Sequence, residues 1–549
     1  MREKILITAK KLMLACLAIL AVVGLGMTRV SALSKDDKAE LKITNIEGKP
    51  KVTLYQIGEG KYSDRGDSFI GFEFFDGAKE LSQTEPTSEQ INKIANGLNE
   101  GGTVVKKIVE TQNLDGNIYV SKKVSAGIYI AILTGAEHGR VYNPILLTAS
   151  YNGDGMIKAG KVSATDHYLY GDTAVAKSSQ PTITKKITKS TKDGDKDTAS
   201  LGEKINYKLT VQLPSYSKEA TNKTVFVSDT MSAGLTFIGS SLRIKWNNKT
   251  LSVTDNKIEA DGKTIADVKI EGNSFYLNFD YDNLEGKSPE VSYSALLNER
   301  AIVGKNGNDN IVEYYYSNNP NKGTTHKGTE KPQEGEGVSK KTDKKVVYTY
   351  RVAFKKIGKG NISLAGAVFG IYSDNDAKQL VDIVVTNENG YGASNQVGQG
   401  TYYIKEIKAP LGYSLNTNVY KVSTSWEKAT TTSEVSWSEI KYTTNDSEKA
   451  IGTTTVGWLL NNIFYKENPG DGGQFAYINK VTEDKSTTTK VEKNQGAGAG
   501  TVLLETEIPN TKLGELPSTG SIGTYLFKAI GSAAMIGAIG IYIVKRRKA

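Results

Sequence analysis

Two parts of this chain place charged residues where an apolar strand pattern would turn them toward a protein interior. In a β-strand, residues i, i+2 and i+4 point to one side, so a charged residue that continues an apolar alternation faces the core. Each part offers one lysine, one acid and one asparagine of this kind. They are Lys185, Asp229 and Asn318 in the middle of the chain, and Lys356, Glu406 and Asn510 nearer its end.

These three residue types can together form an amide crosslink. Burial lowers the pKa of a lysine ammonium and raises the pKa of a carboxylic acid, since both charged forms lose their hydration. The neutral amine is then a nucleophile, and the protonated acid can polarise the asparagine carboxamide. Attack expels ammonia and leaves an isopeptide bond, with no cofactor. We therefore expect Asp229 and Glu406 to be catalytic acids that act once per molecule, in a chain that is not an enzyme.

Strand register leaves an alternative open. Each candidate lysine has a lysine neighbour, Lys186 beside Lys185 and Lys355 beside Lys356. A register error of one residue would put the expected lysine on the solvent side of its strand.

The elements that must position these residues are predicted to be β-strands. Short runs of alternating apolar and polar residues recur between turn residues, which is typical of antiparallel all-β domains. One helix is predicted at 87–98, where apolar residues share a face and Thr87 or Ser88 can cap the N-terminus. The predicted fold class is all-β, with this short helix in the first domain.

Two polar stretches are predicted domain boundaries. They are 174–181, with the sequence AVAKSSQP, and the Gly-rich segment 321–345. The chain between its two ends is long enough for roughly three domains. We expect them at 33–178, 179–340 and 341–513.

The N-terminus has the pattern of a secretory signal peptide. Basic residues precede an apolar stretch at 12–27, and Val30-Ser31-Ala32 has the small-residue spacing of a signal-peptidase site. The predicted signal peptide is 1–32, with a mature chain that starts near Leu33. Cys16, the only cysteine, lies in this segment, so the mature chain has no disulfide.

The C-terminus has the pattern of a surface-anchoring signal at 516–549. Leu516-Pro517-Ser518-Thr519-Gly520 is followed by an apolar run at 525–544 and by a basic cluster at 545–548. The run is about the 20 residues that a transmembrane helix needs, and the cluster should stay cytoplasmic. The pentapeptide resembles the LPXTG signal of Gram-positive bacteria. That resemblance implies that a sortase cleaves between Thr519 and Gly520 and passes the threonine acyl group to an amine.

Composition excludes several classes of function. Much of the net charge of +9 comes from the two ends, so it gives no reason to expect nucleic-acid binding. The mature chain has no cysteine and only scattered histidines, which argues against a transition-metal site. The sequence contains no G-x-S-x-G motif, so it gives no support for a hydrolase.

The third predicted domain resembles the collagen-adhesin B-type domains of Gram-positive pilins. The resemblance covers 350–420 and rests on the motifs 354–357 (FKKI), 364–369 (LAGAVF) and 402–413 (YYIKEIKAPLGY). The last motif is similar to the E-box of the family, with Glu406 at the position of its catalytic acid. This resemblance implies a crosslink between Lys356 and Asn510.

The middle domain resembles the A-type pilin domain. The motifs that carry this resemblance are 181–185 (PTITK), 228–231 (SDTM) and 316–320 (YSNNP). These two resemblances imply that the domains are Ig-like β-sandwiches. They also imply that the domains follow one another in an elongated molecule. In the first domain, Lys42 lies on the face opposite its apolar neighbours, so we expect no crosslink there.

Nearly the whole chain is similar to the streptococcal major (backbone) pilins of the T-antigen type. The resemblance implies a cell-wall-anchored surface pilus, built head to tail from Thr519 to an acceptor lysine of another subunit. No YPKN motif occurs, and position indicates Lys177 as the acceptor, with Lys161 second. The implied partners are a pilus-specific sortase, a housekeeping sortase with peptidoglycan, copies of the chain, and minor tip and base pilins.

A monomeric wall-anchored adhesin that binds a host surface through its first domain is the alternative. It would keep the sorting signal and the crosslinks but would need no acceptor lysine. For the segment 414–500, which is longer than a minimal B-type domain needs, the sequence predicts no function.

Overall fold

The computed structural model describes residues 33–514 with several gaps. The gaps up to residue 424 are 67, 83–85, 100–101, 152–167, 190, 194–195, 305 and 336. Beyond 424, the described residues are 434–437, 440–443, 455–460, 463–465, 470, 474–478, 484–487 and 500–514. The predicted signal peptide, sorting signal and transmembrane run lie outside this description, as does Lys161. No helix in the described part is long and apolar enough to span a membrane.

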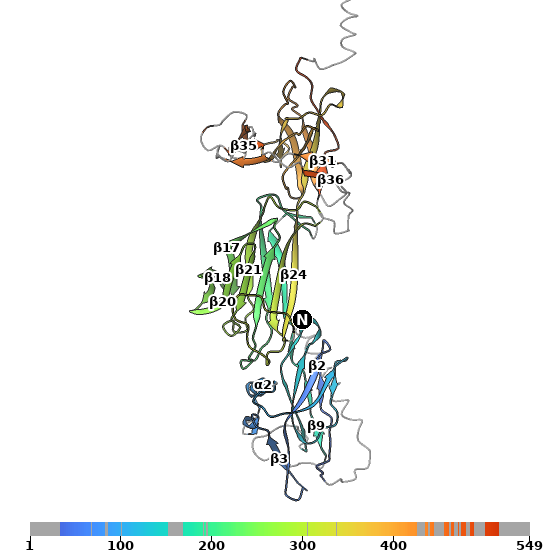
Figure 1. Cartoon of the computed structure of the whole chain (residues 1–549), viewed down its shortest axis with the longest axis vertical. Helices are drawn as coiled ribbons and strands as arrows, with labels where there is room; N and C mark the ends of the chain where they lie inside the picture. Colours follow the sequence, from blue (N-terminus) through green and yellow to red (C-terminus); the bar gives the residue numbers. More distant parts are fainter. Residues whose placement is uncertain are drawn as a thin grey trace, which may run out of the picture.

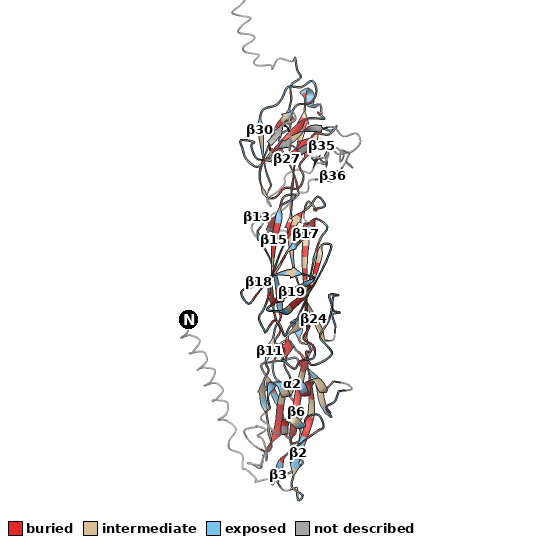
Figure 2. Cartoon of the chain, turned by 90° about the vertical axis from the view of Figure 1, so that its left-hand side faces the viewer, coloured by how far each residue is buried: buried red, intermediate tan, exposed pale blue. Residues whose placement is uncertain are grey.

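The molecule is elongated, and three β domains follow one another along its long axis (Figure 1). Strands dominate the described residues, and their single α-helix lies in the first domain. The predicted all-β fold class is therefore confirmed. Buried residues line the interior of each domain rather than one common core (Figure 2).

In the first domain a helix packs on the main sheet. That sheet has the order β3-β2-β6-β8-β9, with β4 also paired to β2. Helix α2 (Ser88–Gly97) buries Ile94 against Ile57, Ile128 and Ile130 of the sheet. Thr87 and Gln90 form a reciprocal capping box at its N-terminus, which fixes the helix start where the sequence predicts it.

The strands of the first domain have these bounds: β1 Lys42–Thr44, β2 Lys51–Tyr62, β3 Phe69–Phe74, β4 Lys107–Asn113, β5 Tyr119–Val120, β6 Gly127–Thr134, β7 Val141–Tyr142, β8 Ile145–Ser150, β9 Tyr170–Gly171, β10 Thr173–Val175 and β11 Ser178–Ser179. Three-residue strand β1 lies between β10 and β5 in a small second sheet, and β11 pairs with β7.

The second domain is one long path of strands folded around a single core. Its order is β12-β15-β22-β17-β18-β19-β20-β21-β16-β23-β24-β14-β13. Residues from both halves of this path, such as Val291 and Val312, meet in one hydrophobic cluster. The bounds are β12 Thr182–Lys189, β13 Thr191–Asp193, β14 Lys196–Thr198, β15 Lys204–Gln212, β16 Val225–Met231, β17 Leu235–Trp246, β18 Lys249–Thr254, β19 Lys257–Ala260, β20 Lys263–Glu271, β21 Ser274–Phe279, β22 Glu290–Leu297, β23 Asn308–Ser317 and β24 Val338–Tyr348.

The expected boundary at 340/341 falls inside β24. This strand pairs antiparallel with β23 from Asn308↔Val347 to Ser317↔Val338, so it belongs to the second domain. Its residues are mostly polar and only part of their surface is buried, which is why composition alone makes the strand look like a linker.

The third domain packs two small sheets face to face. One contains β25 with β28, β37 and β38, and the other has the order β27-β26-β29-β30. Both contribute to one apolar cluster that includes Phe354, Phe369 and Ile404. The bounds are β25 Arg351–Ile357, β26 Val368–Tyr372, β27 Leu380–Val385, β28 Tyr391–Ala393, β29 Gly400–Lys408, β30 Val419–Thr424, β37 Thr501–Leu503 and β38 Ile508–Pro509.

The long segment before β37 contains further short strands. A pair, β31 (Glu434–Trp437) and β36 (Asp484–Thr487), lies apart from a four-stranded sheet of order β32-β35-β33-β34. That sheet comprises β32 Ile440–Thr443, β33 Thr455–Leu460, β34 Ile463–Tyr465 and β35 Gln474–Ile478.

Hydrogen bonds tie the domains together at both junctions. Between the first two domains, the Asn321 side-chain amide donates to Asn92 and Asn96 of α2. Between the second and third, the Gln396 amide donates to the carbonyls of Glu299 and Ala301, each at 3.2 Å. Only two residues separate β24 from β25.

Candidate crosslinking sites

In the third domain, Lys356, Glu406 and Asn510 lie together in the core. The Lys356 Nζ donates to Asn510 Oδ1 at 2.5 Å and lies 3.4 Å from Glu406 Oε1. The Asn510 Nδ2 donates to the same Glu406 oxygen at 2.9 Å. All three residues are buried. The carboxyl group of Glu406 therefore contacts both the amine and the amide that an isopeptide bond would join.

Strand pairing explains why Lys356 faces inward. The first strand of the domain, β25, runs parallel to β38, with Lys356 opposite Ile508. Phe354 and Lys356 share the buried face, whereas Lys355 points outward and pairs with Glu507 at 2.8 Å. The register alternative that adjacent lysines leave open is thus resolved with Lys356 inside.

Burial changes the acid–base behaviour of Lys356. Loss of hydration is the main cause and lowers its pKa to about 8, against the opposing pull of the Glu406 charge. With this pKa, the Lys356 side chain is a neutral amine in roughly a tenth of the molecules at pH 7, whereas an exposed lysine is charged in almost all of them. The Glu406 carboxylate is held in place by a second hydrogen bond, from the backbone N–H of Asn416 at 2.6 Å.

The second domain contains an analogous cluster of Lys185, Asp229 and Asn310. They come from β12, β16 and β23, and each is almost fully buried. The Lys185 Nζ donates to Asp229 Oδ2 at 2.7 Å and to Asn310 Oδ1. Tyr293 of β22 completes the cluster, because its hydroxyl donates to Asp229 Oδ2 at 2.7 Å and accepts from Asn310 Nδ2 at 3.2 Å.

The lysine and the acid of this cluster are both shifted toward their neutral forms. Burial lowers the pKa of Lys185 to about 8, although the charge of Asp229 opposes the change. Burial raises the pKa of Asp229, with Lys185 acting in the opposite direction. Asp229 Oδ1 is buried and has no hydrogen-bond partner in the described part of the chain. An oxygen without a donor is the better place for a proton.

Asn318, the asparagine expected from the sequence, lies outside this cluster. It follows the end of β23, and its Nδ2 donates to Ser339 Oγ at 2.9 Å. Asn310 lies eight positions earlier, about 26 Å along a strand that rises 3.3 Å per residue. Asn310 and Asn318 have the same parity as Val312, so the alternation that indicated Asn318 also fits Asn310. The pairing of Asp229 with Val312 places Asn310 near the acid.

The first domain has no comparable cluster among its described residues. Lys42 is exposed between buried Leu41 and Ile43, which is the orientation expected from the sequence. No lysine of the described first domain is buried. In the described residues of the whole chain, no group of His, Asp and Glu side chains could hold a metal ion.

Lys177 lies exposed beside a groove between the first two domains. The groove, of about 490 Å³, is lined by Lys177, Ser88 and Glu89 of the first domain and by Ser215 and Lys218 of the second. The Lys177 carbonyl accepts from the Asn143 N–H at 3.4 Å. The backbone at Lys177 is therefore attached to the first domain while its side chain is available.

Known protein families match three parts of the chain, and known relatives match most of its length. The model of the T6 antigen Ig-like domain matches residues 36–178, that of a prealbumin-like fold domain matches 350–440, and that of the LPXTG cell wall anchor motif matches 508–549. The chain is 53% identical to the trypsin-resistant surface T6 protein of Streptococcus pyogenes serotype M6, over 98% of this chain and 100% of that one. It is also similar to the solved T6 backbone pilin of that serotype, with 47% identity, a TM-score of 0.71, and coverage of 88% of this chain and 100% of the other.

Proposed function

The chain belongs to the T6 backbone pilins of streptococci, and we propose how its subunits are crosslinked internally and joined to one another. It is a major structural subunit of a surface pilus that is anchored to the cell wall. Two intramolecular isopeptide bonds form in each subunit, Lys185–Asn310 and Lys356–Asn510. The observation that carries this proposal is a buried lysine amine in contact with an asparagine amide and next to an acid, twice in one chain.

The proposed reaction needs only these residues. A proton moves from the lysine ammonium to the neighbouring carboxylate, which is favoured because burial disfavours both charges. The lysine Nζ then attacks Cγ of the asparagine, while the protonated acid hydrogen-bonds to the carboxamide and stabilises the charge that develops on it. The Nζ–Cγ bond forms and the Cγ–Nδ2 bond breaks. The acid gives its proton to Nδ2, which leaves as ammonia, and takes up the proton that Nζ loses, so the acid is regenerated. Each acid acts once per molecule, so the chain is not an enzyme that turns over.

Assembly is proposed to proceed by transpeptidation. A pilus-specific sortase cleaves between Thr519 and Gly520, holds the threonine as a thioester, and transfers it to Lys177 of another subunit. The exposure of Lys177 beside an interdomain groove supports this choice, since the groove can receive an extended segment. Head-to-tail joining is heterologous and does not close, as a filament requires. A housekeeping sortase, peptidoglycan, and minor tip and base pilins complete the proposed set of partners.

Intact mass of the recombinant ectodomain tests the internal bonds. The wild-type mass should be lower than the sequence mass by two molecules of ammonia. Lys185→Ala, Asn310→Ala and Lys356→Ala should each restore one of them, whereas Asn318→Ala should restore none. A wild-type mass equal to that of the unmodified sequence would refute both bonds.

Surface extracts test the assembly. Wild-type cells should give ladders of multimers that survive sodium dodecyl sulfate, and Lys177→Ala should abolish them. Lys218→Ala is the matched control, because Lys218 is an exposed lysine that lines the same groove. Ladders that persist in Lys177→Ala would eliminate this acceptor, and a single monomer band in wild type would favour the adhesin.

A further inference from the structure

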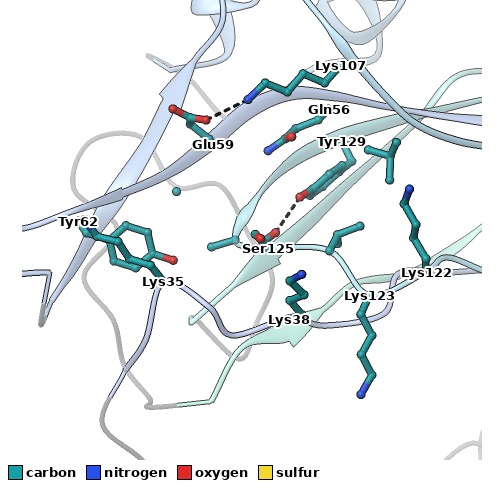
Figure 3. A pocket seen from close by; sticks show the side chains of 14 residues that line it. Lys35, Lys38, Gln56, Glu59, Tyr62, Lys107, Lys122, Lys123, Ser125 and Tyr129 are labelled. Carbon is teal, nitrogen blue, oxygen red and sulfur yellow. Dashed lines mark hydrogen bonds and ion pairs between the residues drawn. The ribbon is translucent and has the colours of Figure 1, made fainter.

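A hollow on the first domain gathers lysine side chains from separate segments of the chain (Figure 3). Its volume is about 360 Å³, and one carboxylate, Glu59, lines it. The lysines that line it are Lys35, Lys38, Lys107, Lys122 and Lys123. Five lysines and one glutamate give the lining a net charge of 5 − 1 = +4.

The backbone around the hollow is fixed by hydrogen bonds. The N-terminal segment and the loop before β6 exchange two bonds, Ala39 N–H to Val124 carbonyl at 2.9 Å and the reverse at 2.8 Å. The Gly60 N–H of β2 donates to the Ala126 carbonyl at 2.9 Å. A side chain at Gly60 would place its Cβ 2.8 Å from the Ala126 Cβ, so glycine permits this close approach. The lysines thus project from a preformed frame.

Most of these positive charges are not neutralised by the protein. Lys107 lies 3.4 Å from Glu59, and the Lys35 ammonium lies 5.5 Å from the centre of the Tyr62 ring. Among the described residues, no ion pair joins an acid to Lys38, Lys122 or Lys123, which are all exposed. Like charges held together repel one another, so an anion in the hollow would relieve a cost that the free protein bears.

Two acids on the segments that carry these lysines or beside them accept hydrogen bonds from neutral donors. Asp37 accepts from the Ser34 N–H and the Tyr151 hydroxyl, both at 3.0 Å. Glu110 accepts from the Tyr119 hydroxyl at 2.5 Å and from the Lys122 backbone N–H at 3.2 Å. Neither contact is with a lysine ammonium, so these acids do not pair with the lysines of the hollow.

We propose that this hollow binds an acidic polysaccharide, one whose sugars carry sulfate or carboxylate groups. Lysine ammoniums are point charges on flexible stems, and here they surround a depression rather than converge on one atom, which suits several anionic groups spread along a chain. The partly buried ring of Tyr62 also lines the hollow. The surface location of the protein makes extracellular glycans the accessible polyanions.

The hollow is separate from the sites of crosslinking and polymerisation. None of the residues that line the hollow belongs to the two lysine–acid–asparagine clusters, and none lines the groove beside Lys177. Lys177 lies where the first domain meets the second. Binding at the hollow therefore does not depend on the proposed assembly.

Calorimetric titration of the ectodomain with a sulfated heparin oligosaccharide tests the proposal, with hyaluronan as the carboxylated probe and neutral dextran as the blank. Binding to one of the acidic probes should weaken as salt rises, because the lysines are exposed. Lys122→Ala combined with Lys123→Ala should weaken it about tenfold, at typical strengths for exposed ion pairs. Lys122→Arg with Lys123→Arg should retain it.

The matched control is Lys245→Ala combined with Lys257→Ala, two exposed second-domain lysines whose loss changes the net charge equally. It should leave the affinity unchanged. If both double variants lost the same affinity, the effect would be one of net charge and the proposed site would be overturned. Failure of the wild-type protein to bind either acidic probe would overturn it as well. Duplex DNA that binds as tightly as the glycan would overturn the assignment to polysaccharide.

Discussion

The second and third domains hold the same lysine–asparagine pair but present the acid to it differently. In the third domain one oxygen of Glu406 reaches both the Lys356 amine and the Asn510 amide. In the second, the shorter Asp229 contacts Lys185 directly, and Tyr293 bridges it to Asn310. The Tyr293 hydroxyl thus adds a link between the acid and the amide. The pair fixes the chemistry, whereas the path from the acid to the amide can vary.

Removal of either lysine should have the largest effect. Lys356→Ala opens a ring of 154 residues and Lys185→Ala one of 125. By the loop-entropy estimate used for disulfides, each loss lowers the free energy of unfolding by about 5 kcal/mol. Scanning calorimetry should show this in the affected domain, with Lys355→Ala as the control, since Lys355 is the neighbouring lysine on the outer face of β25. Thermal transitions that match those of wild type would mean that the bonds carry no stability.

Tyr293→Phe should sharpen the contrast between the two acids. Loss of a hydrogen bond to a charged or polarised group costs about 1.5–3 kcal/mol, so the Lys185–Asn310 bond should form roughly 10 to 100 times more slowly after refolding. Formation of the Lys356–Asn510 bond should keep its rate. Mass spectrometry of digests taken during refolding would follow both bonds in one sample, and equal rates in wild type and variant would remove Tyr293 from the reaction.

The smallest expected effect is on pH dependence, and it should be alike in both domains. Asn310→Ala and Asn510→Ala keep the lysine but block the bond. Burial lowers each lysine pKa to about 8, while an unfolded lysine stays near 10.4. Between these values the unfolded chain binds more protons, so the free energy of unfolding rises with pH. Urea titrations should show a gain of about 1.5 kcal/mol from about pH 8 to about pH 9.5.

Lysine-to-methionine variants provide the control for that titration. Lys185→Met with Asn310→Ala removes the titrating amine and should flatten the rise, as should Lys356→Met with Asn510→Ala. A rise that survives in either double variant would assign it to other groups.

Alternation along the sequence identifies which face a residue takes, but not its position against a neighbouring strand. The faces of Lys185, Asp229 and Lys356 follow from their apolar neighbours. The choice between Asn310 and Asn318 depends instead on the register of β16 against β23, which is set by partners distant in sequence. No signal in the sequence marks Tyr293, because it alternates with Val291 and Ala295 like any core residue.

Local signals predicted local structure well. The helix expected at 87–98 is α2 with its caps, because a capping box and an apolar face act within one short segment. The polar composition of β24 predicts a linker instead, because this strand is stabilised by its pairing with β23 and not by apolar residues of its own.

The junction between the second and third domains bears on the mechanics of the whole fibre. Strand β24 passes into β25 across Thr349 and Tyr350, which are both buried, and Gln396 fastens the two domains from the side. A connection this short and this enclosed leaves no swivel between them. The second and third domains therefore form one stiff unit, and the bending of a long filament falls on its other junctions.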